Sequence, residues 1–353
     1  MLCTHDVQIF NLQAKHLNAR KLPELDALER IIELGAAWLD VHVACQVTMP
    51  KGGSYPVYVI TLGNPSPEVP AVGYFGGVHG LERIGAEVVM AYLHSLVMRL
   101  QWDSTLHKQL ESLRLVFMPI VNPGGLALGT RANPNGVDLM RNAPVQATEP
   151  VPFLVGGQRI SAGLPWYRGL ENQAMEAENQ AVCAVVTQEL LTRSFSVSVD
   201  CHSGFGARDR IWFPFAHQRA PMIHLAELRA LKNIFVQSNS HHRYVIEPQS
   251  LQYLAHGDLW DHLYLQACIT PERIFLPLTL EMGSWLWVKK NPRQLFSRHG
   301  IFNPLIAHRQ QRVLRQHQLF LDFLARAASG HKLWLPTEQT RAALHAQALQ
   351  HWY

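Results

Sequence analysis

Two side chains that commonly bind metal ions, His79 and Glu82, lie three residues apart in the first quarter of the chain. They follow a run rich in β-branched and aromatic residues, at a point where the sequence changes to a helical pattern. At this spacing both side chains can face the same side of the first helical turn. Zinc in catalytic sites commonly takes three protein ligands of the His and Glu type and leaves one position to water. A third ligand therefore has to come from elsewhere.

His202 is the strongest candidate for the third ligand. It follows the apolar run SFSVSVD and precedes Ser203 and Gly204, where a buried strand opens to solvent. Active sites of open α/β sheets lie at the ends of strands. A single histidine in this setting is more often a hydrogen-bonded strand cap, but the His79 and Glu82 pair favours a ligand. The sequence therefore predicts one Zn²⁺ held by His79, Glu82 and His202.

Six short motifs extend this pattern along the chain and resemble those of the zinc carboxypeptidase family, the carboxypeptidase A-like metallopeptidases. The resemblance covers roughly residues 55–325. In chain order the motifs are GGVHGLERIG, PIVNPGG, TRANPNGVDLMRN, VDCHSG, YLAHGDLWD and LTLEMGSW.

The resemblance implies catalytic and substrate-binding roles for four residues outside the zinc ligands. Glu281 matches the catalytic glutamate, which accepts a proton from the attacking water and returns it to the leaving amine. Arg131 matches the arginine that stabilises the tetrahedral oxyanion. Arg141 matches the arginine that receives the terminal carboxylate of the substrate, with Asn142 beside it in the same substrate-binding segment.

Asp138 and Tyr253 take supporting roles on the same resemblance. Asp138 falls where the family has a carboxylate bonded to the first zinc histidine, so we expect it to contact His79. Tyr253 matches the mobile tyrosine that closes over bound substrate. Met140 departs from the family, which usually has asparagine there, and methionine cannot donate that hydrogen bond to a carboxylate. Trp260 falls near the position that sorts substrate side chains, and its bulk argues against a simple preference for basic ones.

Alternating strand and helix patterns must position these residues. Apolar spacing predicts helices over residues 22–40, 81–99, 172–192 and 304–328. Runs rich in β-branched and aromatic residues predict strands over 41–49, 55–63 and 71–78 and within LRLVFMPIVNPGG, SFSVSVDCHSG and IFLPLTLEMGS, the first of these three ending in an Asn-Pro-Gly-Gly turn. This order predicts an α/β fold with a mixed, largely parallel central sheet and helices on both faces, which the resemblance makes a sheet of about eight strands. We expect a single catalytic domain over residues 1–330 and a C-terminal extension over 331–353.

Composition narrows the classes of partner. Hydrophobic residues make up 48% of the 353 residues and charged ones 16%, as in compact enzymes. The net charge is +4 without any basic run, so nucleic acid is not an expected partner. Three further features indicate a cytoplasmic protein that does not enter membranes. The five cysteines have no paired spacing, no apolar run is long enough to cross a bilayer, and no secretory pattern is present in MLCTHDVQIFNLQAKHLNAR. The sequence leaves the oligomeric state open.

The leading hypothesis is a zinc-dependent carboxypeptidase-type metallopeptidase that acts on a peptide. An N-acyl amino acid deacylase or amidohydrolase acting on a small amide stays open, because related zinc enzymes share these ligands. A catalytically silent relative that only binds peptides is the third alternative, although Glu281 argues against it.

Overall fold

The computed structural model describes residues 22–297 and 299–353. The segment that we analysed for a secretory signal lies outside these residues, as do Cys3 and the first 21 residues of the expected domain. The other four cysteines are free thiols. Among the described helices, none combines the length and the hydropathy needed to span a bilayer.

One mixed sheet of eight strands forms the centre of the molecule, and this confirms the predicted fold class. Its strands are β1 (Asp40–Thr48), β2 (Ser54–Gly63), β3 (Ala71–Gly76), β4 (Arg114–Met118), β5 (Phe195–Ser203), β6 (Arg210–Phe213), β7 (Val245–Pro248) and β8 (Ile274–Met282). They lie in the order β1-β2-β4-β3-β5-β8-β6-β7. Parallel pairs are β4–β3, β3–β5, β5–β8 and β6–β7, and the other three pairs are antiparallel.

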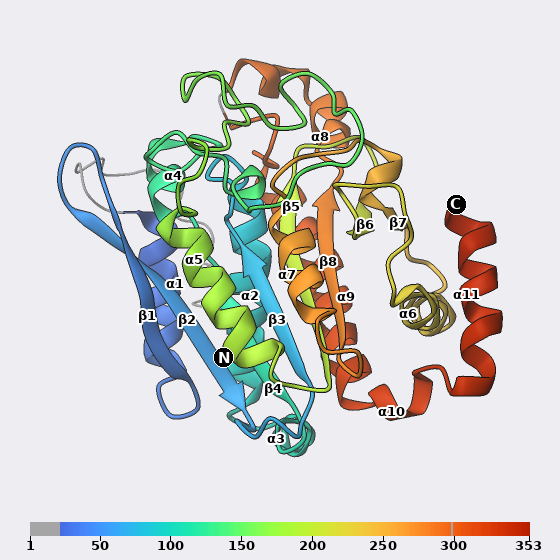
Figure 1. Ribbon diagram of the computed structural model, residues 1–353. Helices are drawn as coiled ribbons and strands as arrows, with labels where there is room; N and C mark the ends of the chain where they lie inside the picture. Colours follow the sequence, from blue (N-terminus) through green and yellow to red (C-terminus); the bar gives the residue numbers. More distant parts are fainter. Residues whose placement is uncertain (1–21, 298) are drawn as a thin grey trace.

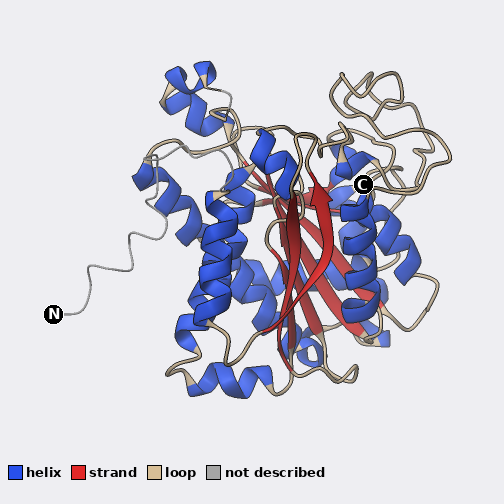
Figure 2. Cartoon of the chain, turned by 90° about the vertical axis from the view of Figure 1, so that its left-hand side faces the viewer, coloured by secondary structure: helices blue, strands red, loops and turns tan. Residues whose placement is uncertain are grey.

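Helices cover both faces of this sheet (Figure 2). They are α1 (Pro23–Leu34), α2 (Arg83–Arg99), α3 (Ser104–Leu110), α4 (Pro123–Leu128), α5 (Ala177–Val185), α6 (Leu225–Ser238), α7 (Leu259–Ala267), α8 (Trp285–Lys290), α9 (Ala307–Ser329), α10 (His331–Trp334) and α11 (Glu338–Trp352). Figure 1 shows α5 and α7 in front of the sheet and α2 and α9 behind it.

The central strands β3, β5 and β8 are buried along their length, apart from Ile274 at the start of β8, which is half-buried. Layers of helices on both faces explain why these runs are apolar without a strict alternation. Since parallel neighbours end at the same edge of a sheet, the segments that follow β3, β5 and β8 meet in one place. That edge carries the candidate site.

Several element boundaries differ from the sequence prediction. The helix expected over residues 22–40 ends at Leu34, where the N–H of Gly35 donates to the carbonyl of Ile31 at 3.0 Å, and β1 begins at Asp40. The Asn-Pro-Gly-Gly sequence begins α4 instead of forming a simple turn, because Asn122 Oδ1 accepts the N–H of Gly125 at 2.7 Å and caps the helix. The short strands β6 and β7, of which β7 lies at the edge of the sheet, were not predicted, since four residues give too little periodicity to read.

Residues 331–353 fold back against the rest of the chain. Helix α11 lies beside α6 (Figure 1). Trp352 is buried, and its indole N–H donates to the carbonyl of Ile246 at 2.7 Å. The division of the chain at residue 330 stays a prediction.

Candidate metal centre

The three predicted metal ligands meet at the carboxyl edge of the sheet. His79 and Glu82 lie between the end of β3 and the start of α2, and His202 is the last but one residue of β5. Helix α2 approaches β5 closely at Gly85, where an added Cβ would lie 2.1 Å from the carbonyl oxygen of Cys201. This close approach brings Glu82 beside His202.

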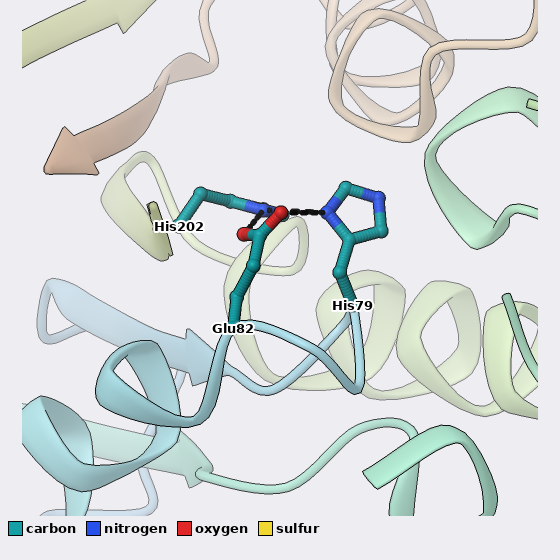
Figure 3. Close-up of side chains that lie close together, drawn as sticks. All are labelled: His79, Glu82 and His202. Atoms are coloured by element: carbon teal, nitrogen blue, oxygen red, sulfur yellow. Dashed lines mark hydrogen bonds and ion pairs between the residues drawn. The ribbon is translucent and has the colours of Figure 1, made fainter. Parts of the chain in front are cut away.

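The side chains of His79, Glu82 and His202 converge on one point (Figure 3). Nδ1 of His79 lies 2.9 Å from Oε1 of Glu82, and Nδ1 of His202 lies 3.1 Å from Oε2 of Glu82. The two Nδ1 atoms are 3.2 Å apart. All three residues are buried.

This donor set fits a zinc ion. Zinc–nitrogen distances of roughly 2.0–2.1 Å in tetrahedral sites place two ligand atoms about 3.3 Å from one another. The 3.2 Å between the imidazole nitrogens agrees with that spacing. Two imidazoles and one carboxylate are also the ligand types of catalytic zinc. Within residues 22–297 and 299–353, no other group of His, Cys, Asp or Glu has this geometry.

Two buried carboxylates contact the Nε2 atoms of the imidazole rings, away from the converging Nδ1 atoms. His79 Nε2 lies 3.1 Å from Asp138 Oδ1, so the expected contact of Asp138 with His79 is present. His202 Nε2 lies 2.6 Å from Asp200 Oδ2. Each carboxylate accepts the Nε2 proton and so leaves Nδ1 free to bind a cation.

Asp200 is a residue of the site that sequence analysis did not single out. Its signal was its position two residues before His202, which places both side chains on one face of β5. Its Oδ2 atom also accepts the indole N–H of Trp260 at 2.9 Å. Trp260 is therefore directed at Asp200 and is not among the residues that line the cavity of the site, contrary to the expectation that it sorts substrate side chains.

The protonation states of the ligands depend on this network. Burial by itself raises the pKa of Glu82, but His79 and His202 outweigh burial and hold that pKa well below its ordinary value. Burial by itself lowers the pKa of His202, but Asp200 and Glu82 raise it well above its ordinary value. In the metal-free protein Glu82 is therefore charged and His202 retains a proton that a divalent cation has to displace.

Glu281 lies on β8 directly beside His202, its partner in the parallel register. Its Oε1 atom accepts the backbone N–H of Phe205 at 3.0 Å. Burial first and the charge of Glu82 second raise the pKa of Glu281 to about 8. A carboxyl group with such a pKa can take up and release a proton near neutral pH.

Arg131 lies between the metal ligands and their supporting carboxylates. Its Nε donates to Asp138 Oδ2 at 2.7 Å, and its Nη1 donates to Glu82 Oε1 at 3.3 Å. Nη2 has no hydrogen-bond partner within the described chain, and Arg131 lines the cavity. The guanidinium is therefore held rigidly with one donor group left free.

Arg141 lines the same cavity, and each of its three nitrogens already contacts a backbone carbonyl. Its Nε and Nη2 both lie 3.2 Å from the carbonyl of Val155, and its Nη1 donates to the carbonyl of Met140 at 3.0 Å. Asn142 is not among the cavity residues. Its side chain instead joins the backbone of Arg168 and Glu176 and supports the long loop over the site.

Tyr253 contributes to an aromatic wall of the cavity, which has a volume of about 450 Å³. Its ring centroid lies 6.0 Å from that of Phe205 and 6.1 Å from that of Trp212. The Tyr253 hydroxyl forms no hydrogen bond with any described residue, which leaves it free to meet a ligand.

Asp258 is a second residue of the site that sequence analysis missed, and unlike Asp200 it lines the cavity. Its Oδ1 atom caps α7 by accepting the N–H of Asp261 at 2.9 Å. Its Oδ2 atom is buried without a hydrogen-bond partner among the described residues. Burial, followed by the charge of Asp261, raises the pKa of Asp258 to about 7. The sequence offered no signal beyond the position of Asp258 within YLAHGDLWD.

Comparison with known proteins gives a family match and several structural neighbours. The family model described as zinc carboxypeptidase matches residues 53–284. The chain is 33% identical over 95 residues to Carboxypeptidase SOL1 of Arabidopsis thaliana, covering 26% of this chain and 19% of that protein. It is 24% identical over 147 residues to Carboxypeptidase D of Anas platyrhynchos, covering 39% of this chain and 9% of that protein. The matched parts thus span less than a fifth of either curated relative.

Two solved structures share the fold at low sequence identity. Thrombin activatable fibrinolysis inhibitor gives a TM-score of 0.62 at 17% identity, over 87% of this chain and 73% of that chain. Carboxypeptidase A from Helicoverpa armigera gives 0.62 at 14% identity, over 88% of this chain and 74% of that chain. At these identities the similarity concerns the fold.

Proposed function

Because this chain belongs to the zinc carboxypeptidase family, we propose that it is a metallopeptidase that removes the C-terminal residue of a peptide. The observation that carries the proposal is the convergence of His79, Glu82 and His202 beside Glu281 at one cavity. These three ligands would hold Zn²⁺, which supplies Lewis-acid polarisation and lowers the pKa of coordinated water to about 7.

Glu281 would move the proton in this reaction. Its Oε1 atom is occupied by the N–H of Phe205, so Oε2 is the atom that accepts a proton from the attacking water. The same atom then returns the proton to the leaving amine. The pKa of about 8 describes the protein without a metal, and the charge of Zn²⁺ would favour the carboxylate form that a base requires.

Arg131 would stabilise the negative charge that develops on the carbonyl oxygen of the substrate. Its contacts with Asp138 and Glu82 fix the guanidinium, and Nη2 remains available as a donor. A donor that is already in place needs no reorganisation when charge appears, which makes it effective in a cavity with little water.

Arg141 would receive the terminal carboxylate, with Tyr253 closing from the side. The Arg141 guanidinium lies 5.8 Å from the centroid of the Tyr253 ring. A carboxylate would share Nη1 and Nη2 with the carbonyls of Met140 and Val155, because each of these nitrogens carries two N–H groups. Met140 is buried at the cavity wall and offers no donor of its own.

The lack of a side-chain donor at Met140 favours one alternative, an amidohydrolase that releases an acyl group from a small amide. Such an enzyme needs the same metal centre and Glu281, but it does not require a strong clamp for a free terminal carboxylate. A single substrate screen separates the two functions.

The screen measures turnover by zinc-loaded protein on three matched substrate sets, with Glu281→Gln as the inactive control. The sets are peptides with a free C-terminus, the same peptides with an amidated C-terminus, and N-acyl amino acids. Release of C-terminal residues from the free peptides alone supports the carboxypeptidase. Equal cleavage of amidated peptides contradicts the role of Arg141, and cleavage restricted to N-acyl amino acids assigns the amidohydrolase. Tight peptide binding without any cleavage would indicate the silent relative.

A further inference from the structure

A second and larger cavity lies outside the candidate metal centre. Its volume is about 1190 Å³, and it is bounded by residues 207–209, residues 238–244, helix α8 and the first half of α9. None of the residues to which we assign metal binding or catalysis lines it. The cavity therefore needs an explanation of its own.

Six permanently charged cations line this cavity, which we call the basic cavity. They are Arg208, Arg243, Lys290, Arg309, Arg312 and Arg315. The one carboxylate in the lining belongs to Asp209, and both of its oxygens are in use. Oδ1 accepts the N–H of Gly283 at 2.9 Å, and Oδ2 accepts Nε2 of Gln316 at 2.6 Å. The net positive charge of the lining is therefore larger than the net charge of the whole chain, which is +4.

The cations of the basic cavity have almost no partners within the protein. Arg309 makes two long contacts of 3.4 Å, to the carbonyls of Trp287 and Lys290. Over residues 22–297 and 299–353, the side chains of the other five cations form no ion pair or hydrogen bond. Arginines elsewhere in the chain are commonly paired, such as Arg99 with Asp103 at 2.9 Å and Arg114 with Glu189 at 3.1 Å.

The arrangement on α9 disfavours the helix itself. Arg309, Arg312 and Arg315 follow one another at intervals of three, and like charges at this spacing repel. They lie in the first half of the helix, whose first turn carries no acidic residue. Cations near a helix N-terminus also oppose the helix dipole. A structural role would not require this unfavourable charge pattern.

Buried aromatic side chains form part of the lining of the basic cavity. They are Tyr244, Trp287 and His317. His242, also in the lining, has a buried Nδ1 atom without a hydrogen-bond partner within the described residues. Charged rims over walls of low dielectric constant focus the electric field into a cleft and attract ions of opposite sign.

We propose that the basic cavity binds a small organic anion that carries two or more phosphate groups. Guanidinium groups match the paired oxygens of a phosphate, and two to three of them satisfy one group. The six cations around this cavity are more than one phosphate group can bind. The cavity volume of about 1190 Å³ is large enough for a small molecule. The site is independent of the peptidase proposal.

Isothermal titration calorimetry on the zinc-loaded chain tests this proposal. The probe is hexane-1,6-diol bisphosphate, compared with inorganic phosphate and with a hexaglutamate peptide. We expect saturable binding of one bisphosphate, tighter than that of inorganic phosphate by about tenfold or more. The variant R312E/R315E is expected to weaken it about 30-fold or more, and K51E/K108E, with the same change in net charge far from the cavity, leaves it unchanged.

The proposal would be overturned by no saturable bisphosphate binding, by equal weakening in R312E/R315E and K51E/K108E, or by tighter binding of hexaglutamate than of the bisphosphate. The last assigns the cavity to an acidic peptide. Since R312E/R315E alters a helix, R208Q/R243Q provides a second test on two loops, and circular dichroism confirms folding of each variant. Unchanged affinity in folded R208Q/R243Q also contradicts the proposal.

Discussion

The metal centre and the basic cavity handle charge in opposite ways. In the metal centre the three candidate ligands, Asp138, Asp200 and Arg131 each lie within hydrogen-bond distance of a group of opposite sign, and all of them except the half-buried Arg131 are buried. In the basic cavity six cations surround one carboxylate that is already bonded, and most of the cations are exposed. Burial requires pairing, because an isolated buried charge loses several kcal/mol of hydration, whereas exposed like charges cost only tenths.

This difference predicts how each region responds to the loss of one charged side chain. Removing one member of the buried network leaves another charge without a partner, so function and metal affinity should fall steeply. Removing one cation from the basic cavity relieves electrostatic repulsion, so the free energy of unfolding should increase slightly.

The largest effect is expected for Glu281→Gln. The amide cannot accept the proton of the attacking water, so the rate of hydrolysis should fall about 10²- to 10⁴-fold. Zinc affinity, measured by competition with a chelator, should stay close to that of the parent protein because Glu281 is not one of the three ligands. The matched control is Glu338→Gln on the exposed first turn of α11. Equal activity of the two variants would remove Glu281 from the mechanism.

Asp200→Asn should lower zinc affinity about 10- to 100-fold. The asparagine cannot stabilise the ring of His202 as the carboxylate does at 2.6 Å. Asp261→Asn is the matched control, because Asp261 forms a buried pair of the same 2.6 Å length with His217 outside the metal centre. Chelator competition on both variants checks the prediction. A similar loss of affinity in the control would show a general effect of the fold.

Zinc affinity should increase with pH by about tenfold per unit from pH 6.5 up to the raised pKa of His202 and level off above it, as expected when one proton is released for each ion bound. The pKa of His202 is raised above its ordinary value, so the ring keeps its proton through this range, and the proton competes with the metal. The pKa of Glu82 is lowered, so that side chain stays charged and adds no slope. Titrations at a series of pH values measure the slope, and an affinity independent of pH contradicts the assigned proton.

The smallest effect is expected for Arg315→Gln, which should stabilise the protein by about 0.2–0.5 kcal/mol at low salt. The change removes a repulsion with Arg312 on the same face of α9. Arg326→Gln near the other end of the same helix is the control and should destabilise slightly, because Arg326 pairs with Asp322 at 2.7 Å. Urea unfolding of both variants measures the difference. Stability changes of opposite sign in the two variants would support the contrast between the two regions. A loss of stability in Arg315→Gln would contradict it.

The part of the site that could be predicted rested on local spacing and strand ends. The three candidate ligands lie at the ends of strands or at the start of a helix, and such boundaries can be recognised in the sequence. They are His79, Glu82 and His202. Asp138 was placed against His79 by the family resemblance alone, and the contact is present at 3.1 Å. The central strands were predicted for the same reason, since long apolar runs leave few other choices.

What could not be predicted depends on contacts between distant segments. Trp260 is directed at Asp200 and not at the cavity, because the orientation of α7 over the sheet decides where its side chains point. The basic cavity gathers cations from four separate stretches of the chain, none of which forms a basic run. A pattern within any one stretch gives no sign of the cavity.

The amino-acid sequence was sufficient to predict the fold class, the three side chains of the candidate metal centre and the family, because these follow from short-range periodicity and from motifs in a fixed order. Only the tertiary structure decided which atoms those side chains offer, which donors of Arg141 remain free, and where unpaired charge accumulates. Protonation and electric field depend on distance and burial in space, and separation along the chain does not fix either of them.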